Sequence, residues 1–113
     1  MAAITLTQGS ATIGTTEYFL ASDSTTATYQ TTDCILQVYL DLGAMATGDE
    51  YLFKIYEKVD GTNAEVIYTC SFLGAQSQMF VTPAFIVGVG WEVSLDKIAG
   101  TDRAIPWTLA KIG

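Results

Sequence analysis

Apolar and polar residues alternate most clearly along two neighbouring segments, residues 51–59 and 64–72. Side chains of a β-strand point alternately to its two sides, so each segment predicts a strand with one apolar face. The apolar face of the first strand holds Tyr51, Phe53, Ile55 and Val59, and that of the second holds Ala64, Val66, Tyr68, Cys70 and Phe72. Together they predict an antiparallel hairpin over a core.

The turn of this hairpin, Asp60-Gly61-Thr62-Asn63, fixes which residues face one another. A four-residue loop places Phe53 opposite Cys70, Ile55 opposite Tyr68 and Val59 opposite Ala64. It also pairs Lys58 with Glu65, which is a favourable cross-strand pair. A two-residue Asp-Gly turn keeps the same faces but pairs Lys58 with Asn63.

Further alternating segments predict strands over residues 34–42, 91–97 and 105–111. Residues 79–83 predict a strand that Pro83 stops or confines to a sheet edge. At the N-terminus, residues 4–7 predict a short edge strand, and residues 9–14 predict a flexible stretch. About seven or eight strands, no substantial helix and frequent turn signals are typical of a sandwich or small barrel.

We therefore expect an all-β fold, an antiparallel, jelly-roll-like β-sandwich. Residues 1–14 are predicted to be an N-terminal arm, and residues 15–113 a single domain. The predicted core consists of Leu36, Val38, Leu40, Phe53, Ile55, Val66, Tyr68, Val93, Leu95, Trp107 and Leu109. Trp91 and Trp107 share faces with other apolar residues, which favours core packing over a sugar-stacking surface.

Charge and hydrophobicity limit the partners. Twelve acidic residues face five scattered basic ones, for a net charge of −7 without histidine. Nucleic-acid binding is not expected, because phosphate contacts need clustered Lys and Arg. Half of the residues are hydrophobic and only 15% are charged, against about 25% in typical soluble domains. This shortage predicts a surface covered by a protein partner, although a Thr- and Ser-rich surface is the alternative.

No segment approaches the roughly 18–20 apolar residues of a membrane span, and residues 1–8 lack the pattern of a signal peptide. We therefore expect no membrane partner, and synthesis in a cytoplasm. Cys34 and Cys70 both fall on predicted inward faces, where two free thiols are expected and a bridge between neighbouring strands is the alternative.

A search for chemistry finds no catalytic motif. Without histidine, the Ser-His-Asp and Cys-His nucleophile pairs are excluded. The carboxylate pairs Asp49-Glu50 and Glu57 with Glu65 are expected to be a solvated turn and hairpin ion pairs. No spaced Asp/Asn/Gly loop or Cys/His set predicts a metal site. We expect no enzyme, no cofactor and no metal.

Several stretches together resemble a family of small proteins encoded among the virion structural genes of tailed bacteriophages. They include residues 14–18, 36–42, 48–51, 54–59, 90–95 and 99–107, so the resemblance covers nearly the whole chain. It implies a structural head protein of the capsid cement or decoration type, on the exterior of the virion and made in the host bacterial cytoplasm. The alternative is a phage tail or adhesion module that binds carbohydrate or a host surface.

The implied partners are the major capsid protein and other copies of this chain, with a homotrimer as the expected assembly. Tyrosines on the more polar strand faces suit an interface, because Tyr combines contact area with a polar tip. The predicted interface residues are Ile4, Leu6, Tyr39, Tyr56, Phe80 and Phe85.

Overall fold

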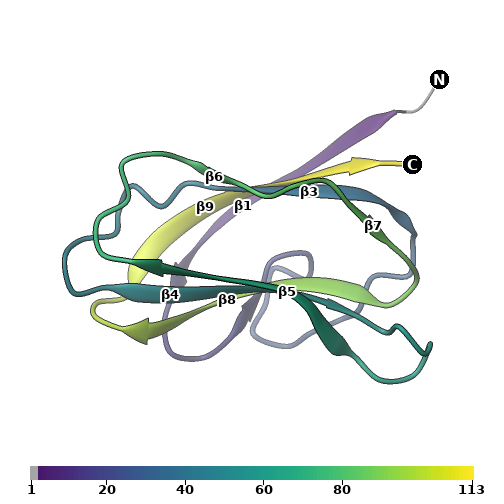
Figure 1. Cartoon of the computed structure of the whole chain (residues 1–113), viewed down its shortest axis with the longest axis horizontal. Helices are drawn as coiled ribbons and strands as arrows, with labels where there is room; N and C mark the ends of the chain where they lie inside the picture. Colours follow the sequence, from purple (N-terminus) through teal and green to yellow (C-terminus); the bar gives the residue numbers. More distant parts are fainter. Residues whose placement is uncertain (1–2) are drawn as a thin grey trace.

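The computed structural model describes residues 3–113, which form two antiparallel sheets packed face to face (Figure 1). The strands are β1 (Ile4–Ile13), β2 (Tyr18–Phe19), β3 (Cys34–Leu40), β4 (Glu50–Glu57), β5 (Glu65–Leu73), β6 (Phe80–Val81), β7 (Phe85–Val87), β8 (Trp91–Ala99) and β9 (Arg103–Ile112). No helix occurs among these residues. The predicted all-β sandwich is therefore confirmed.

The strands divide between two sheets. Sheet A has the order β1-β9-β3-β6, with β7 also paired to β3, and sheet B has the order β2-β8-β4-β5. The start of β1 and the end of β9 lie at the same end of the sandwich (Figure 1), because Ile4 pairs with Ile112.

β6 and β7 are two parts of one interrupted edge strand. Val81 lies opposite Tyr39 and Phe85 lies opposite Leu36, so three residues of the edge face two residues of β3. Such an extra residue is a β-bulge, and it falls at Pro83, which cannot donate a ladder hydrogen bond. Thr82 bridges the interruption, because its N–H donates to Val38 O and its Oγ1 accepts from Val38 N, both at 3.0 Å. Counted this way, the strands agree with the predicted seven or eight.

The predicted N-terminal arm, residues 1–14, is instead a strand of sheet A from Ile4 onwards. β1 has ten residues and pairs with β9 along its whole length. Gly9 does not make the stretch flexible: a Cβ there would lie 2.5 Å from Cζ2 of Trp107, so glycine lets the indole lie against β1. Residues 1 and 2 of the predicted arm lie outside the described residues.

The core between the sheets contains nine of the eleven predicted core residues as buried side chains. Tyr68 is half-buried at its margin, and Val66 is 47% exposed. The cause is a bulge: Ile55 pairs with Tyr68 as predicted, but Tyr56 pairs with Val66, which leaves Ile67 unopposed. The extra residue turns Val66 to the outer side of sheet B.

The same bulge changes the hairpin end. The last pair is Glu57 with Glu65, so Lys58 has neither predicted partner, and its ammonium lies 4.9 Å from the centre of the Tyr29 ring. Val59 was predicted to point inward but is 70% exposed in the turn.

Asp49 is buried, not part of a solvated turn as predicted. Its carboxylate accepts hydrogen bonds from Thr101 N at 3.0 Å, Ala46 N at 2.9 Å and Arg103 Nε at 2.8 Å. These contacts, with the Thr101 N–H first, lower the pKa of Asp49 to about 2. The side chain joins the start of β4 to the turn between β8 and β9, which is a structural role.

Candidate functional site

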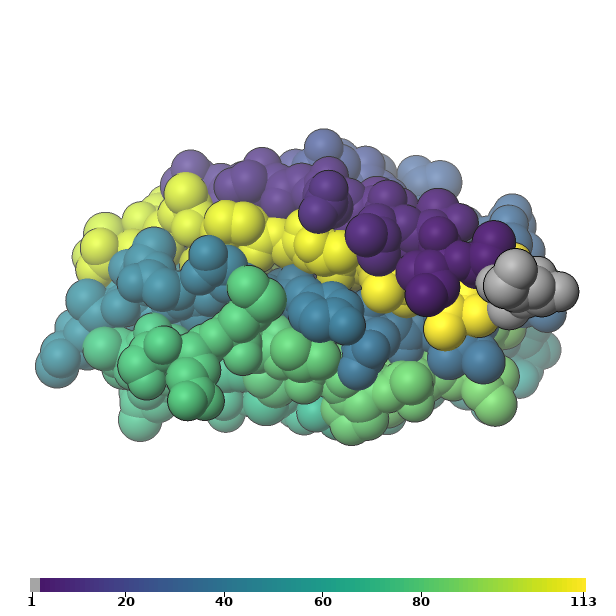
Figure 2. Space-filling model, turned by 90° about the horizontal axis from the view of Figure 1, so that it is seen from above, coloured from purple at the N-terminus to yellow at the C-terminus, as the bar shows by residue number. Residues whose placement is uncertain are grey.

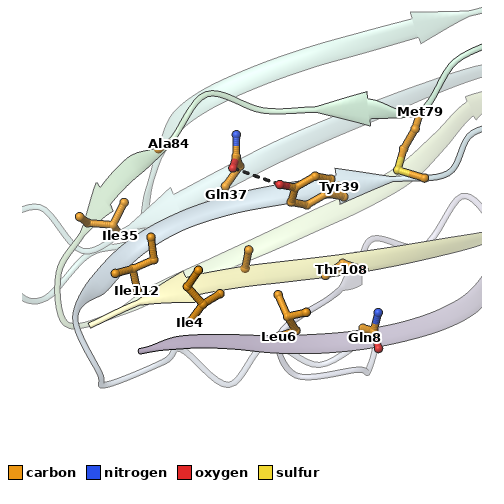
Figure 3. Close-up of a pocket in the computed structure, with 11 residues that line it drawn as sticks. Ile4, Leu6, Gln8, Ile35, Gln37, Tyr39, Met79, Ala84, Thr108 and Ile112 are labelled. Carbon is orange, nitrogen blue, oxygen red and sulfur yellow. Dashed lines mark hydrogen bonds between the residues drawn. The ribbon is translucent and has the colours of Figure 1, made fainter. Parts of the chain in front are cut away.

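The outer face of sheet A carries an apolar groove of about 540 Å³. Its floor and sides come from outward-pointing positions of β1, β9 and β3, with Met79 just before β6 and Ala84 between β6 and β7 (Figure 3). The lining residues are Ile4, Leu6, Gln8, Ile35, Gln37, Tyr39, Met79, Ala84, Thr108, Ala110 and Ile112. None of them is charged, in a chain of net charge −7.

The strand register arranges these side chains in rows across the sheet. Ile4 pairs with Ile112, Ile112 with Ile35, and Ile35 with Ile86, so four isoleucines form one row over four strands. Three of them are strongly exposed: Ile4 by 67%, Ile35 by 41% and Ile86 by 85%. We call Ile4, Ile35, Ile86 and Ile112 the isoleucine row.

The hollow arises because β9, which lies between β1 and β3, carries small side chains. Ala110 lies between Leu6 and Gln37, and Thr108 lies between Gln8 and Tyr39. The larger neighbours on β1 and β3 rise on both sides of these short residues. The groove is therefore built into the sheet and needs no loop to form it.

Hydrogen bonds hold the polar side of the groove in place. Gln37 Nε2 donates to Thr82 O at 2.8 Å, and Tyr39 O–H donates to Gln37 Oε1 at 3.3 Å (Figure 3). Both side chains are thus oriented before any partner arrives, which lowers the entropic cost of binding.

What this face offers is contact area. Removing an exposed Leu or Ile side chain from water contributes about 1.5–3 kcal/mol, and the face exposes several. A partner with a complementary apolar surface fits such a site, and large exposed apolar patches mark interaction surfaces in general.

The outer face of sheet B is of the opposite kind. Glu17 Oε2 accepts hydrogen bonds from Ser94 Oγ at 2.5 Å and Tyr56 O–H at 2.6 Å, and lies 3.5 Å from Lys54 Nζ. Burial works to raise the pKa of Glu17, but Ser94, Tyr56 and Lys54 together lower it. Glu17 and Lys54 are thus paired within the chain, whereas Asp96 Oδ1, on the same face, is buried without a hydrogen-bond partner.

A loop covers part of the same face and buries Glu92 completely. Glu92 Oε1 accepts from Ala21 N at 3.0 Å and from Val93 N at 2.8 Å, while Oε2 accepts from Ser22 Oγ. Burial nevertheless raises the pKa of Glu92 above its ordinary value.

The six predicted interface residues do not gather in one place. Ile4, Leu6 and Tyr39 line the groove, whereas Tyr56 belongs to the polar network of sheet B. Phe80 and Phe85 pair with the buried Leu40 and Leu36 and so point to the core side of sheet A. Their rings lie 4.7 Å from Phe72 and 4.9 Å from Tyr68, between centroids.

The predicted interface residues include only Ile4 of the isoleucine row. Ile35 alternates with Gln37 and Tyr39, so its outward position was visible in the sequence. Its alignment with Ile86 and Ile112 was not, because that alignment depends on strand order and register.

The remaining candidate chemistry is sparse. Cys34 and Cys70 are free thiols on different sheets, and burial raises the pKa of each. Among residues 3–113, no three His, Cys, Asp or Glu side chains come together as a metal site requires. The described chain also has no helix that could cross a membrane.

Comparisons of this chain with protein-family models, curated proteins and solved structures gave no match.

Proposed function

We propose that the protein is a structural component of a phage head, a cement or decoration protein that binds the outside of the assembled capsid. The observation that carries the proposal is the uncharged groove with its exposed isoleucine row on the outer face of sheet A. In this proposal the partner is the major capsid protein, and the protein is neither an enzyme nor dependent on a cofactor.

The strand order supports this class of protein. With β6 and β7 counted as one strand, both sheets have four strands, and the chain passes between the sheets at every connection except that from β4 to β5. The order supports the jelly-roll-like arrangement expected from the sequence, and jelly rolls are found in viral capsid and lectin domains. The support is an analogy at the level of the fold, since one fold serves many functions.

The distribution of charge also supports it. A net charge of −7 disfavours contact with the packaged genome, while the groove face has no charge to repel an acidic or a basic capsid surface. Binding by this face removes the isoleucine row from water, which is the source of affinity in the proposal.

The test is binding of the purified protein to phage heads that lack it, followed by measurement of head resistance to heat. The wild type should bind saturably and raise the temperature at which the heads open. Ile35→Lys places a charge in the isoleucine row at one end of the groove and should lower head affinity at least about tenfold. Ser71→Lys, an exposed position on the outer side of β5 in sheet B, is the matched control and should bind like the wild type.

Equal head binding by the two variants would show that the groove is not the capsid contact. Binding to tails or to host glycans, with none to heads, would overturn the cement function itself.

One observation favours the alternative function, a tail or adhesion module. A smaller hollow of about 240 Å³ adjoins the groove and brings together Tyr39, Asp41 and Gln8. An aromatic ring beside polar groups is a combination that binds sugars. Asp41 lines this hollow but not the groove, so Asp41→Ala should abolish glycan binding if this alternative is correct, and should leave head binding largely intact if the cement function is.

A further inference from the structure

The outer edge of β1 is an unprotected edge of a β-sheet. β1 is the terminal strand of sheet A, and its ten residues include no charged side chain and no proline. Such an edge presents a row of unpaired N–H and C=O groups that can pair with another strand. Figure 2 shows this strand along one margin of the groove face.

The other edges carry features that hinder pairing. The opposite edge of sheet A is broken by the bulge at Pro83. In sheet B, β2 has only two residues, and β5 carries the unopposed Ile67 and the charged Glu65. Bulges, charges, prolines and short strands are the means by which proteins protect edges. β1 has none of them.

We infer that β1 pairs with β1 of a second copy of this chain, antiparallel and about a twofold axis perpendicular to the sheet. The inference goes beyond the proposed function, since it concerns self-association and not the capsid. It replaces the threefold assembly expected from the sequence by a dimer, because a strand pairing with its own copy generates a closed twofold contact.

Charge favours a second copy at this place. Two chains of net charge −7 repel each other, so a contact between them is best made where charge is absent. β1 and the adjoining groove form such a region. Ile4 and Leu6, exposed by 67% and 58%, lie on this edge strand, and the second copy buries part of their exposed surface.

The register follows from the side chains. A twofold axis through an antiparallel pair makes one residue its own partner, and opposite residues point to the same side of the sheet. With Leu6 as that residue, Leu6 faces Leu6 of the second copy and Ile4 faces Gln8, all on the groove side. Thr5 then faces Thr7 on the inner side. The two grooves lie side by side on one face of a continuous sheet.

The first experiment is cysteine cross-linking. In a chain with Cys34→Ala and Cys70→Ala, single cysteines replace Ile4, Thr5, Leu6, Thr7 and Gln8 in turn, with Ser71→Cys on β5 as the matched control. Directly opposed residues of a strand pair have Cα atoms about 4.5–5.5 Å apart, within the range of a disulfide. After mild oxidation, Leu6→Cys should give the most disulfide-linked dimer and Ser71→Cys the least.

The second experiment is sedimentation over a range of concentrations. The wild type should show a monomer–dimer equilibrium, and Leu6→Lys, which sets two like charges opposite each other, should raise its dissociation constant at least about tenfold. Ser71→Lys should leave it unchanged. A monomer or trimer at all concentrations, or cross-linking at positions 4–8 no stronger than at position 71, would overturn the inference.

The outcomes separate this inference from the proposed function. Head binding is tested through Ile35 on β3, and dimer formation through Leu6 on β1. If the protein binds heads but stays monomeric, only the inferred dimer is overturned. If it forms the dimer but does not bind heads, only the cement function is overturned.

Discussion

The two sheets contribute similar inner faces to the core, but their outer faces differ. Sheet B carries a network in which Glu17, Lys54 and Tyr56 are partners of one another, and a loop covers Glu92. Within residues 3–113, sheet A carries no such network and no covering loop; its groove is uncharged and its isoleucine row is exposed.

This difference shows which face is more nearly complete within one chain. Glu17 and Glu92 on the outer side of sheet B have their partners inside the molecule, whereas Asp96 Oδ1 is buried there without a hydrogen-bond partner. The apolar side chains of sheet A gain free energy only when another surface covers them. A function based on binding is therefore expected on sheet A.

The largest expected effect separates the inner and outer sides of one strand. Leu36 and Ile35 are neighbours on β3, but Leu36 is fully buried whereas Ile35 is 41% exposed. Leu36→Ala should lower the free energy of unfolding by about 2–5 kcal/mol, because it leaves a cavity in the core. Chemical denaturation followed by tryptophan fluorescence measures the loss.

Ile35→Ala is the matched control and should cost less than about 1 kcal/mol, since the side chain is already partly in water. A cost equal to that of Leu36→Ala would mean that Ile35 is as well packed as the core. The outer face of β3 would then be as well packed as its inner face, and the difference proposed between the two faces would not hold for this strand.

A second, smaller effect is expected on β1. Gly9→Ala should cost about 1–3 kcal/mol, because the added Cβ meets the ring of Trp107 on the inner side. Gln8→Ala, one residue away on the outer side, should be nearly neutral. A shift in tryptophan emission for Gly9→Ala alone would place the disturbance at the indole, while equal stability of the two variants would refute the close approach.

These residues also show how far the sequence predicts the fold. Alternation alone predicted the strands now seen as β3, β4, β5, β8 and β9, because each has one face in the core. It did not predict that β1 continues through Gly9, since a glycine next to serine is typical of a flexible stretch. Only the position of Trp107 on the neighbouring strand explains why glycine is required there.

The candidate site was predicted in part for a similar reason. Ile4, Leu6 and Tyr39 were predicted to be interface residues, and they line the groove. Phe80 and Phe85 were also predicted to be interface residues, but the bulge at Pro83 and the pairing with β3 turn their rings to the core. A run of apolar residues does not reveal which of its sides is outward without the register of its partner strand.

The smallest expected effect concerns the covered face of sheet B. Because burial raises the pKa of Glu92 in the folded protein, the ionised form is disfavoured there. The associated stability is present at low pH and is lost as the pH rises through this raised pKa. Asp96, whose pKa burial also raises, contributes in the same direction.

Glu92→Gln should remove only the contribution of Glu92. The amide oxygen still accepts from Ala21 N and Val93 N, and the amide N–H donates to Ser22 Oγ, whose own proton is then donated to Thr28 O instead of to residue 92. At low pH, we expect the free energy of unfolding of Glu92→Gln to lie within about 1 kcal/mol of that of the wild type. As the pH rises above 4.5, the ordinary pKa of a glutamate, the variant should become more stable relative to the wild type. Glu92→Ala, which leaves both N–H groups without this acceptor, should lose about 1–3 kcal/mol throughout. Denaturation of all three proteins from pH 4 to pH 8 measures the free energy of unfolding as a function of pH. Asp96 is present in all three, so its contribution cancels in the comparison. Parallel pH curves for Glu92→Gln and the wild type would show that Glu92 is not held with a raised pKa beneath the loop.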